Sequence, residues 1–520
     1  MKSHPRPVLT IILIAPLCCA GAVLALAAEK HSAYQAAFES ITTEDLMRHV
    51  SRLADDDMEG REAGRAGGRA AADYLAEQYD NLKLRGAGAE GDFFQPFSRN
   101  YRNVLAMIEG ADPALRDQVI IVCAHYDHIG FGGFASRGPR GQIHPGADDN
   151  ASGTAAVLEL AEAMTFFSPP LKRSIMFAHW DAEEKGLLGS RHWAANATTP
   201  LENVVAAINL DMIGRVRDDR LAIFGSRSGQ GWRRLFCLHN DEAGLHLLFP
   251  WGIRPNADHY PFFDRGVPAV MLHSGLHDDY HRPSDRIELI DGPGMERVTQ
   301  LLFGAVCALA DARESLPGYR ADARYETHFI EQSLCERAVK PADRLGVGWR
   351  EAASAGGGVR VSRTRAGSPA QKAGLLPGDL IVRFAGREIR ADADFFAAVS
   401  SAASPAAMIV ERPGAEKPLE LTVHLDGKPL RWGIYWRLDE AEPGMVILSH
   451  VVPGSPADRA GLAPGDRIYR VAGRDFQNET EFVHLIADQV AMLRLLVERD
   501  GRLQIVTLLL DVSVSREKAA

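Results

Sequence analysis

The stretch VIIVCAHYDH, from Val119 to His128, passes from an apolar run directly into a group of polar side chains. The run is short and rich in β-branched residues, which predicts a buried strand. If the chain stays extended beyond it, His125 and Asp127 point to the same face, because side chains alternate along a strand. Asp127 could then hold the imidazole nitrogen that a metal ion leaves free. An ordinary core or surface pair has the same pattern, so a metal site needs further ligands elsewhere.

Three more apolar runs that predict buried strands also end at carboxylate or imidazole groups. They are 174–180, followed by Asp181, Glu183 and Glu184; 204–210, followed by Asp211; and 267–272, followed by His273, Tyr280 and His281. The segment GADDNASG at 146–153 places two adjacent carboxylates before a helical pattern, and these repel each other unless a cation joins them. Sites in open α/β sheets form just beyond the carboxyl ends of strands. Four such endings favour a metal centre over solvated surface.

The second half of the chain repeats itself. GSPAQKAGLLPGDLI begins at Gly367, and GSPADRAGLAPGDRI begins at Gly454. In each copy Ser-Pro-Ala predicts the start of a helix, because Ser is a good N-cap and Pro suits the first turn. Two copies predict two similar small domains rather than a solenoid, which needs more and shorter repeats.

These two copies resemble the PDZ domain of exported bacterial proteases, over 343–427 and 430–513. PDZ domains bind peptide or protein C-termini as an added strand, with backbone N–H groups holding the carboxylate. The resemblance places these groups in two matching loops, at Leu345, Gly346 and Val347 and at Trp432, Gly433 and Ile434. Spacer or lid domains with closed grooves are the alternative.

The ordered motifs AHYDH, GADDNASG, DAEEKGLLGS, NLDMIGR and YHRPSD in the first half resemble those of the M28 family of zinc peptidases. The resemblance implies a metallopeptidase domain over 35–315, with a linker over 316–342. It also implies an α/β fold in which a mixed, mostly parallel sheet is sandwiched by helices, as in other zinc exopeptidases. Two small PDZ-like domains of strands and helices would follow.

The same resemblance assigns a role to each residue that matches a family motif. The implied metal ligands are Asp149, shared by two ions, His125 and Asp211 at one ion, and Glu184 and His281 at the other. Glu183 matches the general base that activates a metal-held water, and Tyr280 matches a tyrosine that stabilises the oxyanion. The Asp149–Asn150 bond is expected to be cis. Five N/O ligands of this kind suit two zinc ions, although Co²⁺ or Mn²⁺ could also occupy them.

Several neighbouring residues remain alternatives within this set. Asp148 has the same chemistry as Asp149, although only Asp149 occupies the fourth position of G-x-x-D-x-x-S-G. GADDNASG is also the pattern of an N-cap turn without a metal. The alternative imidazoles to His281 are His259, His273 and His277.

The N-terminus has the order of a secretory signal. Lys2 and Arg6 precede an apolar run over 8–26, and small residues follow up to Ala28. This order predicts a signal peptide over 1–28 and export to the periplasm or the extracellular space. An uncleaved anchor is the alternative, because the run approaches the length that spans a bilayer. The net charge of −10 argues against a nucleic-acid partner, which would need a basic face.

Together with the family resemblance, the sequence predicts an exported di-zinc aminopeptidase that hydrolyses N-terminal residues from peptides. A carboxypeptidase is one alternative, for which Arg215 or Arg282 could bind the free α-carboxylate. The others are a glutaminyl-cyclase-like acyltransferase with one zinc, and a scaffold that only recognises peptides. Because every implied ligand lies before the linker, a chain cut at about residue 340 is expected to keep a folded, active peptidase domain.

Overall fold

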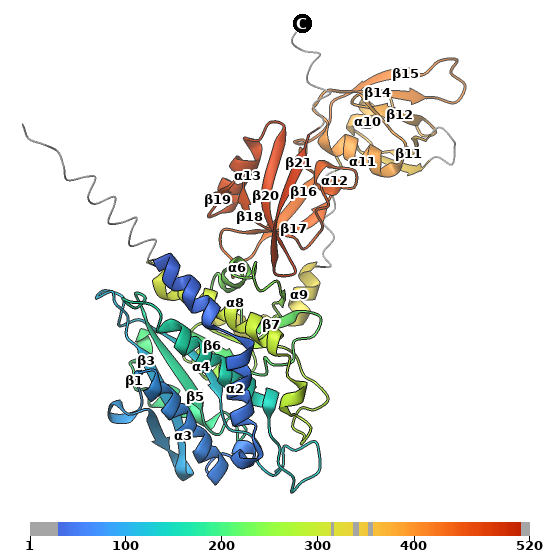
Figure 1. Cartoon of the computed structure of the whole chain (residues 1–520). Coiled ribbons are helices and arrows are strands. Elements are labelled where there is room, and N and C mark those ends of the chain that lie inside the picture. The colour runs from blue at the N-terminus through green and yellow to red at the C-terminus, as the bar shows by residue number, and fades with distance from the viewer. Residues whose placement is uncertain (1–29, 314–316, 336–342, 352–356, 511–520) are drawn as a thin grey trace, which may run out of the picture. The chain divides into compact units, whose positions relative to one another are not determined.

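A computed structural model describes residues 30–313, 317–335, 343–351 and 357–510 (Figure 1). The signal peptide predicted over 1–28 lies outside this part of the chain, as does part of the linker predicted over 316–342. Two compact units divide the chain: Met1–Ser228 with Glu242–Ala321, and Gly229–Asp241 with Asp322–Ala520. In the described ranges, no helix is long and apolar enough to cross a membrane.

The first unit is built around a nine-stranded mixed sheet in the order β1-β3-β5-β4-β6-β9-β7-β8, with β2 paired to β3. Its strands are β1 (Arg85–Gly86), β2 (Phe94–Phe97), β3 (Tyr101–Ile108), β4 (Val119–His125), β5 (Ser174–Trp180), β6 (Val204–Leu210), β7 (Arg220–Phe224), β8 (His246–Leu248) and β9 (Ala269–His273). The central strands β5, β4, β6 and β9 run parallel, whereas β3 and β7 join the sheet antiparallel. Every residue of β4 and β5 is buried, as strands covered on both faces require.

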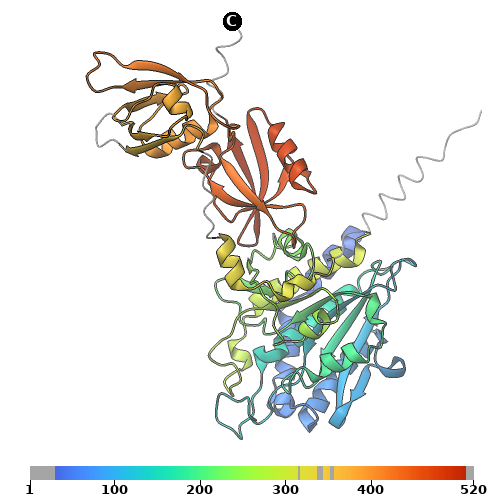
Figure 2. The ribbon, with the colours of Figure 1, turned by 180° about the vertical axis from the view of Figure 1, so that it is seen from behind.

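Helices cover the sheet on both sides, as the two opposite views show (Figures 1 and 2). They are α2 (Thr43–Leu53), α3 (Ala66–Asn81), α4 (Gly153–Met164), α5 (Leu188–Ala195), α7 (Tyr260–Phe263) and α8 (Gly292–Asp311). Helices α2, α4 and α8 pack on one another, and α4 and α8 contact β4. The predicted α/β fold is confirmed, with the parallel pairing concentrated at the centre of the sheet.

The strand order brings four polar strand ends to one edge of the sheet. Strand β4 ends at His125, and β9 ends at His273. Strand β5 ends just before Asp181, and β6 ends just before Asp211. Because these strands are parallel neighbours, their carboxyl ends point the same way, and a site can form beyond them.

The second unit contains two six-stranded antiparallel sheets with the same layout, β10-β11-β12-β14-β15 with β13, and β16-β17-β18-β20-β21 with β19. The first has β10 (Val347–Glu351), β11 (Val359–Thr364), β12 (Leu380–Phe384), β13 (Arg387–Glu388), β14 (Ala406–Glu411) and β15 (Leu419–Val423), with helices α10 (Pro369–Lys372) and α11 (Asp392–Ser401). The second has β16 (Ile434–Leu438), β17 (Val446–Val451), β18 (Arg467–Val471), β19 (Arg474–Asp475), β20 (Met492–Arg499) and β21 (Arg502–Leu509), with α12 (Pro456–Arg459) and α13 (Glu479–Ala487). The hydroxyls of Ser368 and Ser455 cap α10 and α12, as the repeat predicted.

One short segment from the first half of the sequence belongs to the second unit. Helix α6 (Trp232–Leu238) lies in the chain between β7 and β8, yet it packs with the second PDZ-like domain. Arg233 forms a two-point ion pair with Glu498, with both N–O distances 2.9 Å. The Glu442 carboxylate accepts hydrogen bonds from the backbone N–H groups of Arg233 and Arg234 at the start of the helix. The fold of this domain therefore includes residues 229–241.

This packing changes the expectation for a truncated chain. Cutting at about residue 340 removes Glu442 and Glu498, the carboxylates that hold α6. The ligands of the candidate site all precede the cut, but a segment of chain between β7 and β8 would lose its partners. No local sequence pattern predicts this packing, because the partners lie more than 200 positions apart.

We expect Arg233→Ala to destabilise the second unit by about 3–5 kcal/mol, the usual cost of breaking a buried ion pair from one side. The side chain of Glu498 is 0% exposed, so the substitution leaves a buried carboxylate without its two-point partner. Arg234→Ala is the matched control, because its partner Asp475 is 43% exposed and such pairs contribute at most about 1 kcal/mol. Urea unfolding of the full chain measures both, and equal losses for the two variants would contradict a structural role for the Arg233–Glu498 pair.

Candidate active site

A tight loop before α4 carries the two adjacent aspartates. Gly146 begins it with a φ of 59°, where a Cβ atom would lie 2.2 Å from the backbone oxygen of Asp149. The Asp149–Asn150 peptide bond is cis, as the family resemblance implied. The Asn150 amide nitrogen donates to the backbone oxygen of Leu210, and its Oδ1 accepts from the backbone N–H of Met212. The loop is thus fixed to the end of β6, beside Asp211.

A third carboxylate fixes the same loop from outside. The backbone N–H groups of Asp148 and Asp149 both donate to Asp285 Oδ2, at 3.0 and 3.1 Å. Burial raises the pKa of Asp285 to about 6, and the charge of Asp148 adds to this. With its backbone held in this way, Asp149 projects its carboxylate toward the ends of β4 and β6.

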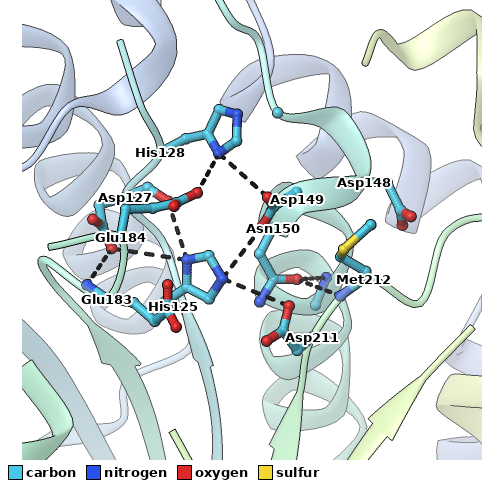
Figure 3. A network of polar contacts seen from close by, with 12 residues as sticks. His125, Asp127, His128, Asp148, Asp149, Asn150, Glu183, Glu184, Asp211 and Met212 are labelled. Atoms are coloured by element: carbon cyan, nitrogen blue, oxygen red, sulfur yellow. Dashed lines mark hydrogen bonds and ion pairs between the residues drawn. The ribbon is translucent and has the colours of Figure 1, made fainter. Parts of the chain in front are cut away.

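Asp149 is shared by two clusters of potential metal ligands, which are His125, Asp149 and Asp211 in one and His128, Asp149 and Glu184 in the other (Figure 3). Its Oδ1 is 3.5 Å from His125 Nε2, which is in turn 3.7 Å from Asp211 Oδ1. Its Oδ2 is 3.1 Å from His281 Nε2, which is 3.3 Å from Glu184 Oε2. One carboxylate therefore faces both groups, with one oxygen for each.

These residues fit two metal ions that share Asp149. His125 Nε2 lies 3.5 and 3.7 Å from its two carboxylate neighbours, and His281 Nε2 lies 3.1 and 3.3 Å from its own two, the spacing expected around one ion with bonds of about 2.0–2.2 Å. Asp149 Oδ2, Glu184 Oε1 and His281 Nε2 are buried without a hydrogen-bond partner in the described structure. Burial alone would raise the pKa of Asp149, but the adjacent imidazoles of His125 and His281 hold it well below its usual value. The donor set of imidazole and carboxylate is the one that zinc uses in proteins.

The imidazoles that face the two groups are oriented by backbone carbonyls. His281 Nδ1 lies 3.0 Å from the backbone oxygen of Ala135, and His125 Nδ1 lies 3.1 Å from that of Asp127. A hydrogen bond at Nδ1 fixes the tautomer and leaves Nε2 free for a metal. The sequence suggested that the Asp127 carboxylate would hold His125. That carboxylate lies 3.8 Å away and instead accepts the backbone N–H of Glu183 at 3.0 Å, so the contact differs from the one expected.

Glu183 shares a cavity with both ligand groups without belonging to either. Burial raises its pKa well above the usual value, and the neighbouring carboxylates of Asp258 and Glu184 add to the rise while His125 opposes it. A carboxylate with a raised pKa beside a candidate metal site, and outside its ligand groups, is placed to accept and return a proton.

The cavity around this centre has a volume of about 350 Å³, which is at the lower end of the range for small-molecule sites. Its lining residues are His125, Arg137, Asp149, Glu183, Glu184, Asp211, Met212, Ala222, Phe224, Asn256, Ala257, Met271, His273, Gly275, Leu276, Tyr280 and His281. The ring of Tyr280 stacks on that of His281 at 3.8 Å between centroids, and burial raises the pKa of its hydroxyl. Tyr280 thus remains a protonated donor beside the centre.

The alternatives left by the sequence have other contacts. The Asp148 carboxylate turns away from Asp149 and accepts hydrogen bonds from Ser152 and the backbone of Gly214, and its Oδ2 lies 3.1 Å from His277 Nε2. His273 lines the cavity, but its Nδ1 accepts the backbone N–H of Gly275. His259 differs from the others, because neither of its buried ring nitrogens has a hydrogen-bond partner in the described structure, and burial lowers its pKa to about 4. None of these imidazoles belongs to either ligand group within the described residues.

The structure adds three residues to which the sequence analysis assigned no role. His128 Nδ1 lies 2.9 Å from Glu184 Oε1 and belongs to the second cluster of ligand-type atoms. Asp285 holds the aspartate loop, and the fully buried Arg61 donates to the backbone oxygens of Pro145 and Gly146. His128 and Asp285 stood in the quoted motifs AHYDH and YHRPSD as polar residues without an assigned role, which was the available signal, whereas Arg61 lies outside the quoted motifs.

The two predicted PDZ loops differ in detail. In the first domain, a cavity of about 160 Å³ lies between β10 and α11, lined by Asp343, Arg344, Leu345, Val347, Trp349, Phe395, Phe396, Val399 and Ser400. Gly346 has a φ of 75° in this loop. In the second domain the position of Leu345 is taken by Trp432, whose buried indole N–H donates to the backbone oxygen of Ile486. Gly433 also has a positive φ, and Ile434 is buried.

Residues 103–306 match the sequence profile of peptidase family M28, and residues 360–412 and 447–499 each match that of a PDZ domain. The chain therefore combines an M28 peptidase domain with two PDZ domains, as its motifs indicated.

Its relatives are similar at low identity. Aminopeptidase YwaD of Bacillus subtilis is 28% identical over 199 residues, which cover 36% of this chain and only 40% of that protein. Leupeptin-inactivating enzyme 1 of Streptomyces exfoliatus is 26% identical over 328 residues, 60% of this chain and 67% of that protein. Among solved structures, LapA of Legionella pneumophila gives a TM-score of 0.45 at 20% identity, over 54% of this chain and 77% of LapA.

Proposed function

We propose that this protein is an exported di-zinc aminopeptidase that removes N-terminal residues from peptides. The observation that carries the proposal is the Asp149 carboxylate, which faces His125 with one oxygen and His281 with the other. Glu183 in the same cavity supplies a base outside the ligand groups. The names of the relatives, aminopeptidases among them, support the same activity.

Each side chain has a task in this reaction. Zinc ions held by the two groups would polarise the scissile carbonyl and lower the pKa of a water to about 7. The Glu183 carboxylate accepts the proton of the attacking water and passes it to the departing amine nitrogen. The Tyr280 hydroxyl donates a hydrogen bond to the oxygen on which negative charge develops. Asp127 holds the backbone of Glu183, and the carbonyls of Ala135 and Asp127 keep the two imidazoles in their tautomer.

The carboxypeptidase alternative loses its two suggested arginines. Arg215 pairs with Asp279 at 3.1 Å, and neither Arg215 nor Arg282 lines the cavity. A one-zinc acyltransferase is disfavoured by the two ligand groups, which a single ion would leave half empty.

A panel of peptides tests the proposal directly. We expect the full, zinc-loaded chain to release leucine from Leu-Ala-NH₂ and to leave N-acetyl-Leu-Ala-NH₂ intact, with two zinc ions per chain by elemental analysis. Removal of zinc by a chelator should abolish the release, and added zinc should restore it. If the protein cleaves only the N-blocked peptide, or only releases ammonia from a peptide with an N-terminal glutamine, the aminopeptidase proposal is wrong and another reaction takes its place.

Peptide binding is a second function that we propose for the first PDZ domain. Its cavity between β10 and α11 is lined by apolar side chains, including Leu345, Val347 and Phe395. An added peptide strand with an apolar C-terminal side chain would bury this surface. In the second domain the corresponding loop carries Trp432, whose indole is buried and hydrogen-bonded to the backbone oxygen of Ile486. This contact favours a structural role for that copy.

Export also remains a proposal. The order of charged, apolar and small residues over 1–28 supports a signal peptide and a periplasmic or extracellular location.

A further inference from the structure

The acidic cavity has one guanidinium on its wall. Four carboxylates line it, those of Asp149, Glu183, Glu184 and Asp211, and the arginine among the described lining residues is Arg137. Three of these carboxylates belong to the ligand groups, so the metal ions would compensate their charge. Arg137 forms no ion pair in the described structure, and its charge is therefore available to a ligand in the cavity.

The loop that carries Arg137 is tied to a candidate metal ligand. The backbone N–H of Arg137 donates to the backbone oxygen of His281 at 3.0 Å. Two residues earlier, the backbone oxygen of Ala135 lies 3.0 Å from His281 Nδ1. These two contacts fix the backbone of residues 135–137 relative to His281. The backbone of Arg137 is therefore held in place in addition to any contacts of its side chain.

The guanidinium is also positioned by an aromatic ring. Its central carbon lies 4.6 Å from the centroid of the Tyr280 ring, within the range of a cation–π contact. The same ring stacks on His281, at 3.8 Å between centroids. The guanidinium and a candidate metal ligand therefore contact the same aromatic ring. An extended peptide advances about 3.5 Å per residue, so a group one or two residues beyond the cleaved bond can reach it.

We propose that Arg137 binds the C-terminal carboxylate of short peptides, so that the preferred substrates are dipeptides and tripeptides with a free C-terminus. The inference rests on the proposed aminopeptidase function and names its substrate class. A guanidinium presents two parallel N–H donors that match the two oxygens of a carboxylate. A C-terminal amide, or an internal residue of a longer chain, does not offer this pair of oxygens at the same place. The cavity volume of about 350 Å³ suits a short peptide.

The test compares Leu-Ala with Leu-Ala-NH₂ as substrates of the full, zinc-loaded chain. We expect the ratio of their kcat/KM values to favour the free carboxylate, and Arg137→Ala to lower this ratio about 10-fold to 100-fold, as the loss of a charged hydrogen bond implies. Arg137→Lys should keep part of the preference, because it keeps the charge but not the fork. Arg140→Ala, an exposed arginine of the same loop outside the cavity lining, is the matched control and should keep the wild-type ratio.

A binding measurement gives a readout without turnover. Calorimetric titration compares the Glu183→Gln chain with the same chain that also carries Arg137→Ala. The second substitution should weaken the binding of Leu-Ala more than the binding of Leu-Ala-NH₂. An equal ratio in wild type and Arg137→Ala, in both measurements, would overturn the assignment while hydrolysis of Leu-Ala-NH₂ still upheld the aminopeptidase. If neither peptide is cleaved and N-acetyl-Leu-Ala is, the aminopeptidase proposal itself fails.

Discussion

Glu183→Gln is expected to lower kcat by at least the 10²–10⁴-fold that general acid–base groups contribute, while both metal ions remain bound. Glutamine has nearly the same shape but cannot accept a proton from water. Glu183 lies in the cavity and outside both ligand groups, so the metal centre does not need its charge. Its position depends on the backbone hydrogen bond to Asp127, which the substitution leaves in place. Turnover on Leu-Ala-NH₂ and elemental analysis of the same sample measure both effects.

The neighbouring residue gives a matched control. Glu184→Gln makes the same chemical change one position later, but Glu184 belongs to a ligand group and lies 3.3 Å from His281. This variant should lose zinc as well as activity, whereas Glu183→Gln should lose activity alone. Near-normal turnover in a fully metallated Glu183→Gln chain would remove the base assignment. Loss of zinc from both variants would show that Glu183 is a ligand instead.

The place of the candidate site could be predicted from the sequence because of how strand ends behave. His125 ends a run of apolar residues, and Asp211 follows another, so both were expected at the carboxyl ends of buried strands. Parallel neighbours in a sheet bring such ends together whatever the details of the loops. The helices of the PDZ repeat could also be predicted, because their first residues carry a local signal. Ser368 and Ser455 cap the helices that follow them.

Contacts that depend on one specific pairing could not be predicted in this way. The ion pair between Arg233 and Glu498 joins residues 265 positions apart, and neither stands in a periodic pattern that points to the other. The role of Asp285 is another case, because its carboxylate accepts backbone N–H groups rather than meeting a complementary side chain. Backbone contacts leave no residue type to search for. For the same reason the carbonyl of Asp127, and not its carboxylate, was missed as the partner of His125 Nδ1.

Asp149→Asn is expected to reduce the bound zinc below two ions per chain. In this structure the Asp149 oxygens lie 3.5 Å from His125 Nε2 and 3.1 Å from His281 Nε2, so a single side chain serves both groups. An amide carries no negative charge, and its nitrogen cannot ligate, so one group loses a ligand and the shared charge between two cations disappears. Losing a residue that only orients a ligand costs 10–100-fold in metal affinity, and losing the shared ligand should cost at least about 100-fold for one ion.

Asp148→Asn separates this effect from a general loss of carboxylate charge in the loop. The Asp148 carboxylate accepts hydrogen bonds from Ser152 and the Gly214 backbone, which an amide oxygen can also accept. The Asp148→Asn variant should therefore keep two zinc ions, whereas the Asp149→Asn variant should not. Elemental analysis after equilibration at the same free zinc concentration compares the two. Two ions per chain in Asp149→Asn would show that the two groups do not share this carboxylate, and the proposed chemistry would then need a single-metal site built on one of them.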